Sequence, residues 1–264
     1  MTSIEAVVRI VRDGPVATIT LNRPATLNAF DRALIERFGA ALRTVDEDET
    51  VRVVIVTGAG RGFSAGQDTR ELAHEEAAGG AAAVGRQVRD RYNPVILRLR
   101  LMEKPIIAAI NGVATGAGLG VAMACDLRIA SADASFVISP IAIGLIPAIG
   151  GTAMLPALIG LSRATELAFF GERIDAATAH KVGLVHRVVP STELNSAARE
   201  YADRLAALPT TAIGLTKRAF NRAIFPDLAE HLAREADWQE SAAGTAEHRQ
   251  RLEALIRKQR GTAR

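Results

Sequence analysis

The chain has 264 residues, of which 48% are hydrophobic and 23% charged, and its formal net charge is +3. This length and apolar share predict one globular domain, or a core with a smaller lobe, that buries a hydrophobic interior. The positive excess is small and acidic residues are interleaved with it, which argues against nucleic acid as a partner. A small polyanionic ligand fits the charge balance better.

A single cysteine, Cys125, excludes an internal disulfide and a metal site built on cysteines. It stands in an apolar segment, so we expect a buried thiol without a catalytic role. The first residues lack the pattern of a signal peptide, and no uncharged apolar run reaches transmembrane length. We therefore expect a cytoplasmic protein with no membrane partner, no metal and no tightly bound cofactor.

The N-terminal part is predicted to begin with a hairpin, since the residues on both sides of Asp13-Gly14 alternate between apolar and polar. Asp31 is a suitable N-cap for the helix that follows. Asn93-Pro94 is expected to interrupt the long helix near the middle of the chain. The predicted elements are strands at 6–12 and 16–21, a helix at 31–47, a strand at 51–57 and a helix at 71–101.

The next part of the chain is predicted to alternate between strands and helices. Ser162 and Asp175 are candidate N-caps, and Gly171 and Gly183 are candidate helix ends. The predicted strands lie at 105–110, 127–130, 136–138 and 185–189, and the helices begin at Gly150-Gly151, Ser162 and Asp175.

After Pro190 every remaining segment has helical periodicity, and no strand is predicted. Four amphipathic helices are expected at 191–208, 210–223, 227–243 and 245–260. We therefore divide the chain into a strand-and-helix core at 1–190 and a helical lobe at 191–264. Helices without a sheet to pack on often pack on another subunit, so the lobe is expected to mediate oligomerisation.

Two glycine-rich turns are the main functional signal. Gly116, Gly118 and Gly120 follow an apolar strand and open a helix, where missing Cβ atoms and unpaired N–H groups suit a phosphate or an oxyanion. A second turn, at 58–68, follows the strand at 51–57. Two such units can each supply one backbone N–H to the same carbonyl oxygen.

Other glycine motifs fit these turns poorly. The run Gly58-Ala-Gly-Arg-Gly62 is not followed by a helical segment, as a dinucleotide-binding fingerprint requires. The Gly-Lys-Ser/Thr of a P-loop is absent from the sequence.

The order and spacing of these motifs resemble the enoyl-CoA hydratase/isomerase (crotonase) superfamily over nearly the whole chain. The resemblance implies an α/β fold, with a spiral core of ββα turns and a C-terminal helical oligomerisation lobe. It further implies homotrimers or dimers of trimers, and an acyl-CoA thioester as ligand, with coenzyme A as part of the substrate. Within the family, the run 60–68 and Tyr92-Asn93-Pro94 are most similar to the ring-epoxide isomerases of phenylacetyl-CoA breakdown. The matching segments are 21–24, 28–29, 57–68, 104–112, 116–126, 144–152 and 179–185.

The resemblance assigns the two oxyanion-hole donors to the backbone N–H groups of Gln67 and Gly118. Family hydratases use two glutamates to add water, and some isomerases carry an aspartate in the next loop. These three positions match Gly120, Ile141 and Ala148, none of which carries a proton-transfer group. Because general acid–base help contributes roughly 10²–10⁴-fold per group, ordinary hydration is expected to be slow.

The remaining site residues follow from their positions in the matched motifs. Tyr92 is either a wall of the acyl pocket or a packing aromatic with a surface hydroxyl. Ser139 and Thr152 either position a water or make local turn and cap bonds, and Asp68 either serves the ligand or caps a helix. The histidines are expected at the surface. The predicted coenzyme A contacts are Arg23, Ala25, Ser64, Ala65, Gln67, Asp68 and Lys258, and the predicted acyl-pocket residues are Thr69, Arg70, Tyr92, Gly120, Ser139, Ile141 and Ala148.

The leading hypothesis is therefore an acyl-CoA-processing enzyme that stabilises a thioester enolate and works as an isomerase or by another non-hydratase reaction. A protein that binds or carries an acyl-CoA without turnover is the first alternative. A thioester hydrolase that uses bound water is the second.

Overall fold

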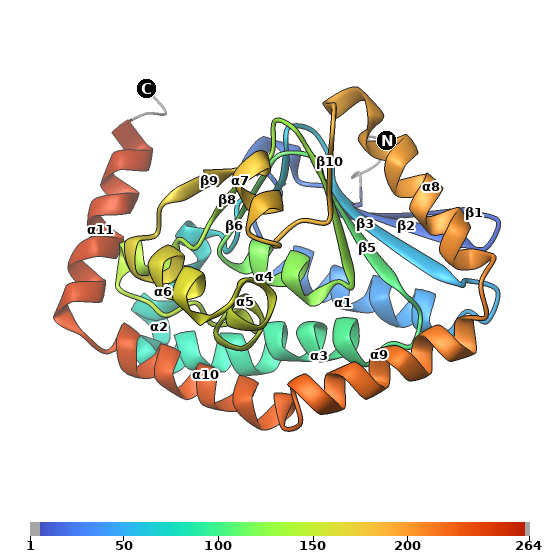
Figure 1. Ribbon diagram of the computed structural model, residues 1–264. Coiled ribbons are helices and arrows are strands. Elements are labelled where there is room, and N and C mark those ends of the chain that lie inside the picture. The colour runs from blue at the N-terminus through green and yellow to red at the C-terminus, as the bar shows by residue number, and fades with distance from the viewer. Residues whose placement is uncertain (1–5, 262–264) are drawn as a thin grey trace, which may run out of the picture.

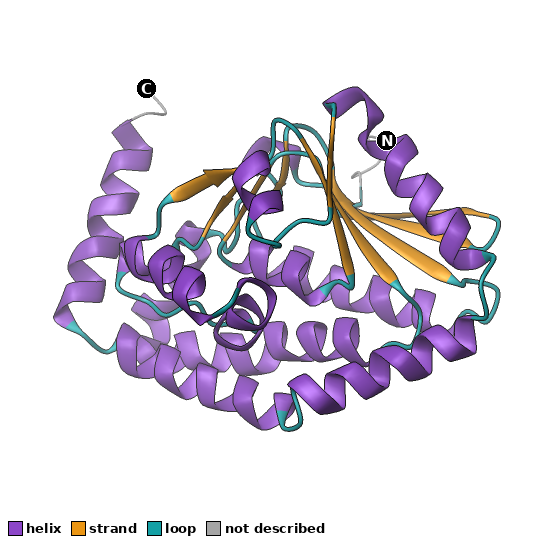
Figure 2. Ribbon diagram, viewed as in Figure 1, coloured by secondary structure: helices purple, strands orange, loops and turns teal. Residues whose placement is uncertain are grey.

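The computed structural model describes residues 6–261, which form two β-sheets enclosed by helices (Figure 1; Figure 2). The larger sheet has the order β1-β2-β3-β5-β7-β10 and the smaller one the order β4-β6-β8-β9. The larger sheet consists of β1 (Val8–Asp13), β2 (Val16–Leu21), β3 (Val53–Gly58), β5 (Ile106–Ile110), β7 (Leu127–Ser131) and β10 (Arg187–Val189). The smaller sheet consists of β4 (Gly62–Ser64), β6 (Val113–Thr115), β8 (Ser135–Val137) and β9 (Arg173–Asp175).

The helices between the strands and after them account for most of the remaining chain. The α-helices are α1 (Arg32–Glu47), α2 (Thr69–Gln87), α3 (Asn93–Leu101), α4 (Ala117–Ala124), α5 (Gly151–Ile159), α6 (Leu161–Phe170), α7 (Ala176–Lys181), α8 (Leu194–Ala206), α9 (Thr210–Ile224), α10 (Leu228–Ala243) and α11 (Ala246–Gly261). The short helices are η1 (Pro24–Thr26), η3 (Pro140–Ile143) and η4 (Ser191–Glu193), with a π-helical turn η2 (Val88–Tyr92). No helix among residues 6–261 is long and apolar enough to cross a bilayer.

The expected ββα spiral is confirmed by the way the two sheets are connected. A strand of the larger sheet is followed by a short strand of the smaller sheet and then by a helix, as in β3-β4-α2, β5-β6-α4 and β7-β8-α5. The central strands β3, β5 and β7 pair in parallel, and β3 and β5 are almost continuously apolar, as is typical of strands buried on both faces. The loops that leave these strands therefore lie at the same edge.

Aspartates begin the predicted helices where they were expected. The Asp31 carboxylate accepts a hydrogen bond from the Leu34 N–H at 2.8 Å, and Asp175 accepts one from the Thr178 N–H at 2.7 Å. The prediction for Ser162 is wrong, because α6 begins one residue earlier, after Gly160, without a side-chain cap. Gly160 ends α5 as well, so one glycine separates two consecutive helices.

The break in the long helix differs from the expectation. A π-helical turn at Val88–Tyr92 absorbs the irregularity, and Pro94 then occupies the first turn of α3, where a missing N–H costs no hydrogen bond. The strands β4, β6 and β9 were not predicted at all. Each has three residues, which is too short for an alternating pattern to be recognised.

The helices after residue 190 share the core with the strands. Leu194, Ala197 and Ala198 of α8 pack on the face of the larger sheet formed by β3, β5 and β7, while α1 and α3 belong to the core on the opposite face. Residues of α10 belong to that second cluster too. Figure 1 shows α9 and α10 running along the lower side of the molecule, beneath α3.

A buried ammonium group attaches α9 to this core. The side chain of Lys217 is 6% exposed, and its Nζ donates to the Leu99 carbonyl and to the Asp126 carboxylate, both at 2.8 Å. The same carboxylate accepts from the Ile106 N–H at 2.9 Å, at the start of β5. One ion pair therefore links a C-terminal helix, α3 and the central strand.

Replacing Lys217 by Met is expected to lower the free energy of unfolding by about 2 kcal/mol or more, because a poorly hydrated Asp126 loses its nearest cation. Arg100, 3.4 Å from Asp126, moderates the loss. The matched control is Arg218→Met, since Arg218 pairs with Glu103 at the surface, where the two side chains are 60% and 45% exposed. That change is expected to cost less than about 1 kcal/mol. Equal losses in urea denaturation would contradict the assignment.

Candidate functional site

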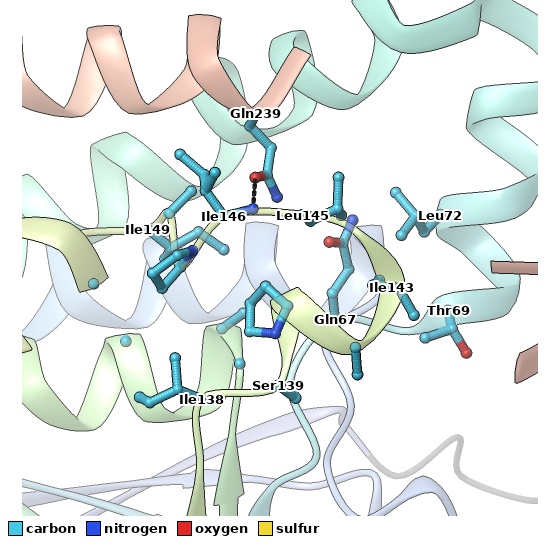
Figure 3. A pocket seen from close by; sticks show the side chains of 18 of the residues that line it. Gln67, Thr69, Leu72, Ile138, Ser139, Ile143, Leu145, Ile146, Ile149 and Gln239 are labelled. Carbon is cyan, nitrogen blue, oxygen red and sulfur yellow. Dashed lines mark hydrogen bonds between the residues drawn. The ribbon is translucent and has the colours of Figure 1, made fainter. Parts of the chain in front are cut away.

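A cavity of about 490 Å³ lies at the edge of the sheets where the two glycine-rich turns meet the C-terminal helices. Its walls come from the turn at 65–69, the start of α4, the segment 138–151, and α10 with α11. Figure 3 shows this arrangement, with Gln67, Ser139 and Gln239 as polar groups among aliphatic side chains. The apolar side chains that line it include Leu72, Met123, Ile138, Ile143, Leu145, Ile146, Ile149 and Leu255.

The two glycine-rich turns touch each other through their backbones. A Cβ atom on Gly118 would lie 2.5 Å from the Cβ of Ser64, and one on Gly66 would lie 2.7 Å from the Thr115 carbonyl oxygen. Real Cβ atoms do not approach other atoms so closely, so both positions require glycine at this packing. Gly66 also has a φ of +86°, which other residues rarely adopt. The contact places the chain after β4 directly beside the start of α4.

At this contact the N–H groups of Gln67 and Gly118 lie outside the backbone hydrogen bonds of the strands and helices. The Phe30 N–H donates to the Gly66 carbonyl, and the Phe30 carbonyl accepts from the Asp68 N–H. The Gln67 N–H, between them, takes no part in this bridge. Gly118 is the second residue of α4, where a helix offers its N–H groups no internal acceptor. The α4 dipole adds positive potential at the same end of the helix.

The wall opposite these groups is held by two side chains of α10. The Gln239 Oε1 accepts a hydrogen bond from the Ile146 N–H at 3.1 Å (Figure 3). One turn earlier, the fully buried Glu235 carboxylate accepts from the Gly150 N–H at 2.7 Å and from the Thr152 N–H at 3.0 Å. The start of α5 and the segment before it are therefore fixed by a carboxylate at a helix N-terminus.

Thr152 does not face the cavity with a free hydroxyl. Its Oγ1 bonds to Glu235 and lies 2.7 Å from the Nε2 of His231. The structure thus supports the local bonding alternative over a water-positioning role. For another histidine, His248, the predicted surface position is wrong. It is fully buried, with Nδ1 at the Ile143 carbonyl and Nε2 3.0 Å from the Glu76 carboxylate.

Seven of the predicted site residues line the cavity: Ala65, Gln67, Thr69, Gly120, Ser139, Ala148 and Lys258. Gly118 lies between two lining residues of α4. The Gln67 side chain does not extend freely, because its Nε2 donates to the buried Gln87. Lys258 and Arg251 are seven residues apart on α11, hence on the same face of that helix, and both reach the cavity.

The structure puts several other predicted residues outside the cavity. Tyr92 is wrong as a wall of the cavity, because it is 1% exposed and packs edge-to-face on Phe30, with ring centroids 6.2 Å apart. Burial raises the pKa of its hydroxyl, which lies 3.5 Å from the Phe30 carbonyl. Ile141 is 40% exposed on η3 and does not line the cavity, and neither does Arg70.

The predicted coenzyme A residues near β2 and β4 have partners within the chain. The Arg23 guanidinium lies 3.1 Å from the Asp31 carboxylate and 3.4 Å from that of Asp68. Asp68 caps α2 by accepting from the Arg70 N–H at 3.2 Å, as the helix-capping alternative requires. Ser64 is fully buried, and its hydroxyl donates to the Asn28 carbonyl at 2.8 Å. None of these three, nor the exposed Ala25, lines the cavity.

Within the described part of the chain, the cavity lining contains no Asp, Glu, His, Cys or Tyr. Position 120 has no room for a longer side chain, because a Cβ on Gly120 would lie 2.8 Å from the Ile149 carbonyl oxygen. Among residues 6–261 no group of three or more His, Cys, Asp or Glu side chains is arranged to hold a metal ion. The described lining therefore offers side-chain amides, two hydroxyls and two cations.

It was not predicted from the sequence that α10 contributes side chains to the cavity, or that α11 contributes any besides Lys258. Gln239 and Arg251 both line the cavity, and neither was singled out. A signal was present, since Glu235 and Gln239 occupy the helical stripe that also carries Leu228 and Leu232. Polar residues on the apolar face of an amphipathic helix point to buried hydrogen bonds or to a site.

Comparison with known proteins finds the same pattern over nearly the whole chain. A family model described as enoyl-CoA hydratase/isomerase matches residues 12–261. The chain is 40% identical over 243 residues to the 1,2-epoxyphenylacetyl-CoA isomerase of Escherichia coli (strain K12), with 92% of each chain covered. It is 36% identical over 250 residues to the short-chain-enoyl-CoA hydratase of Clostridium acetobutylicum, with 94% of each covered. A solved enoyl-CoA hydratase from Mycobacterium avium subsp. paratuberculosis K-10 superposes with a TM-score of 0.85 at 30% identity, with 96% of each chain covered.

The close packing of α4 predicts different outcomes for two helical glycines. Gly120→Ala is expected to lower the free energy of unfolding by about 1–2 kcal/mol, because the Ile149 backbone must move. Gly39→Ala in α1 is the control, since a Cβ there would meet Val95 at an ordinary 3.4 Å. That change is expected to be neutral, or to stabilise by up to about 1 kcal/mol through helix propensity. Thermal or urea denaturation compares the two, and an equal response would contradict the packing argument.

Proposed function

This chain belongs to the enoyl-CoA hydratase/isomerase family, and on that premise we propose that its cavity binds an acyl-CoA thioester and stabilises negative charge on the thioester oxygen. The observation that carries the proposal is the backbone contact between the two glycine-rich turns, Gly66 against Thr115 and Gly118 against Ser64. This contact brings together two chain segments that each carry an N–H group, that of Gln67 or Gly118, without an acceptor in the strand pairing or in the helix.

The Gln67 and Gly118 N–H groups are the proposed donors to the thioester oxygen. Removing a proton next to the thioester carbon, or attacking that carbon, moves negative charge onto this oxygen. A donor already aimed at the charge contributes on the order of 3 kcal/mol, since no reorganisation is needed when the charge develops. Because both donors belong to the backbone, the identity of the side chain at position 67 does not affect them.

The coenzyme A end is proposed to lie toward α11. Its phosphates are anionic, and Arg251 and Lys258 are the cations that line the cavity. Arg23 is less suited to this role, because it does not line the cavity. Coenzyme A enters as part of the substrate, with no separate cofactor.

The chemical step is proposed to be an isomerisation or another non-hydratase reaction. Adding water across a double bond needs one group to activate the water that attacks C3 and another to protonate C2, whereas a double-bond shift moves a single proton between two carbons; the described lining of the cavity has no carboxylate for the first task. A shift of the double bond within the acyl chain consumes no water: one proton leaves C2 and one arrives at C4, through an enolate whose charge rests on the thioester oxygen. We assign the transfer of that proton to water in the cavity. The name of the Escherichia coli relative, an isomerase, supports this class of reaction.

The same lining favours one second candidate, a protein that binds an acyl-CoA without turnover. Oxyanion-hole donors and cations suffice for binding, whereas every proton transfer needs a carrier. A thioester hydrolase ranks behind both, because attack by water on the thioester carbon calls for a general base, which the lining lacks among the described residues.

We further propose that the protein works as a homotrimer or a dimer of trimers in the cytoplasm. Large apolar side chains on α6 and α9 support association, since Phe169 and Phe170 are each 71% exposed and Phe220 is 64% exposed in the single chain. Burial of such side chains in a subunit interface removes apolar surface from water.

A pair of ligands tests the proposed oxyanion hole. Butyryl-CoA and S-butyl-CoA have the same chain, but the thioether lacks the carbonyl oxygen. We expect the thioether to bind about tenfold more weakly or worse in titration calorimetry, because the two N–H groups lose their acceptor. Equal dissociation constants would mean that the carbonyl points elsewhere. Failure of both ligands to bind would remove the proposed function itself.

A second pair tests the reaction. Crotonyl-CoA is expected to be hydrated at least about a hundredfold more slowly than by the Clostridium acetobutylicum relative assayed alongside it, because the acid–base groups are absent. 3-Butenoyl-CoA, its isomer, is expected to gain the absorbance of a conjugated thioester. Hydration at the relative's rate would overturn the reaction assignment. Binding of both thioesters without any conversion would favour the binding protein.

A further inference from the structure

Gln239 of α10 lines the cavity with its side-chain amide although the residue is almost fully buried. The residue is 4% exposed, yet it belongs to the lining. The side chain reaches from α10 to the segment that carries Leu145 and Ile146, with its oxygen bonded to the Ile146 N–H at 3.1 Å (Figure 3). Most of the other side chains that line the cavity are aliphatic, Leu72 and Ile149 among them.

The orientation of this amide is fixed by chemistry. A backbone N–H only donates, so the atom of the Gln239 amide that faces the Ile146 N–H must be the oxygen. The Nε2 atom therefore lies on the other side of the carboxamide group. The Nε2 is not sealed within the protein either. Among the described residues the Nε2 has no hydrogen-bond partner, and it is not one of the buried side-chain atoms without a partner, which belong to Asn22, Arg52, Asn93 and Thr115. The amide therefore offers N–H donors on the side that is open to the cavity.

The position of the donor is rigid as well as its orientation. Glu235, one turn earlier on α10, accepts from the Gly150 and Thr152 N–H groups at 2.7 and 3.0 Å. Gln239 and Glu235 thus hold the two ends of the same wall segment against one helix. A donor held in an apolar wall is costly when a ligand displaces its water without replacing the hydrogen bond. A ligand that brings an acceptor to this point avoids that cost.

We propose that Gln239 makes the cavity selective for acyl groups that carry a hydrogen-bond acceptor, such as an ether or ketone oxygen, over hydrocarbon groups of the same shape. The inference rests on the proposed function, since it concerns the acyl end of the same thioester. Gln239 acts here on specificity, and the oxyanion-hole donors on the other side of the cavity are separate from it.

Matched ring compounds provide the test. Cyclohexylacetyl-CoA is compared with the three oxanylacetyl-CoA isomers, in which a ring oxygen replaces one CH₂ group at position 2, 3 or 4. An ether oxygen accepts hydrogen bonds and donates none. We expect the wild-type protein to bind at least one oxane isomer about three- to tenfold more tightly than the cyclohexyl compound in titration calorimetry.

Two variants distinguish the loss of the Gln239 donor from a general disturbance of α10. Gln239→Met keeps an unbranched side chain of similar length and removes the donor, so the ratio of dissociation constants is expected to fall to one or below. Loosening of the wall affects all four ligands alike and cancels in that ratio. Ser241→Ala is the control on the same helix, because the Ser241 hydroxyl donates to the Asp237 carbonyl at the surface. It is expected to keep the wild-type preference.

The outcomes distinguish this inference from the proposed function. If the wild-type protein binds cyclohexylacetyl-CoA but shows no preference for any oxane isomer, the selectivity is wrong and the acyl-CoA proposal stands. A preference that survives in Gln239→Met also overturns the role of Gln239, and this holds whether or not binding weakens overall. If no thioester of the set binds, the proposed function fails and the inference fails with it.

Discussion

The contact between the two glycine-rich turns is the constraint on which the rest of the site depends. Gly118 meets Ser64 and Gly66 meets Thr115 at distances that leave no space for a Cβ atom. The parallel pairing of β3 with β5 brings the two turns to the same edge, and the short strands β4 and β6 then pair as well. Any side chain at these glycines would separate the turns and, with them, the two N–H groups that the proposed function uses.

The C-terminal helices complete the cavity from the other side. Glu235 and Gln239 of α10 accept hydrogen bonds from the backbone of the wall segment, and Arg251 and Lys258 of α11 line the same cavity. His248 fastens α11 between η3 and α2. The last third of the chain therefore shapes the site as directly as the strand-rich part does.

The cavity combines strong means of binding an anion with weak means of moving a proton. In the proposed function, backbone donors hold the thioester oxygen and two cations the phosphates of coenzyme A, while the described lining of the cavity lacks carboxylates and imidazoles. The tight packing of Gly120 on the Ile149 carbonyl shows that this is a property of the backbone as well as of the side chains. Selectivity, rather than general acid–base power, is what the remaining polar groups can provide.

The sequence by itself determined the features that depend on neighbours along the chain. The capping aspartates, the buried strands and the glycines of both turns follow from local spacing. The ββα order and the lack of a carboxylate at Gly120 and Ala148 followed from the resemblance to the family, and the short strands β4, β6 and β9 were not predicted. Tertiary structure decided which distant residues meet. Tyr92 packs into the core, Arg23 forms ion pairs with two aspartates, and Gln239 lines the cavity with its amide. These outcomes were beyond the sequence because a helix pattern gives the face a side chain occupies, while the partner on that face is set by the packing of elements far apart in the chain.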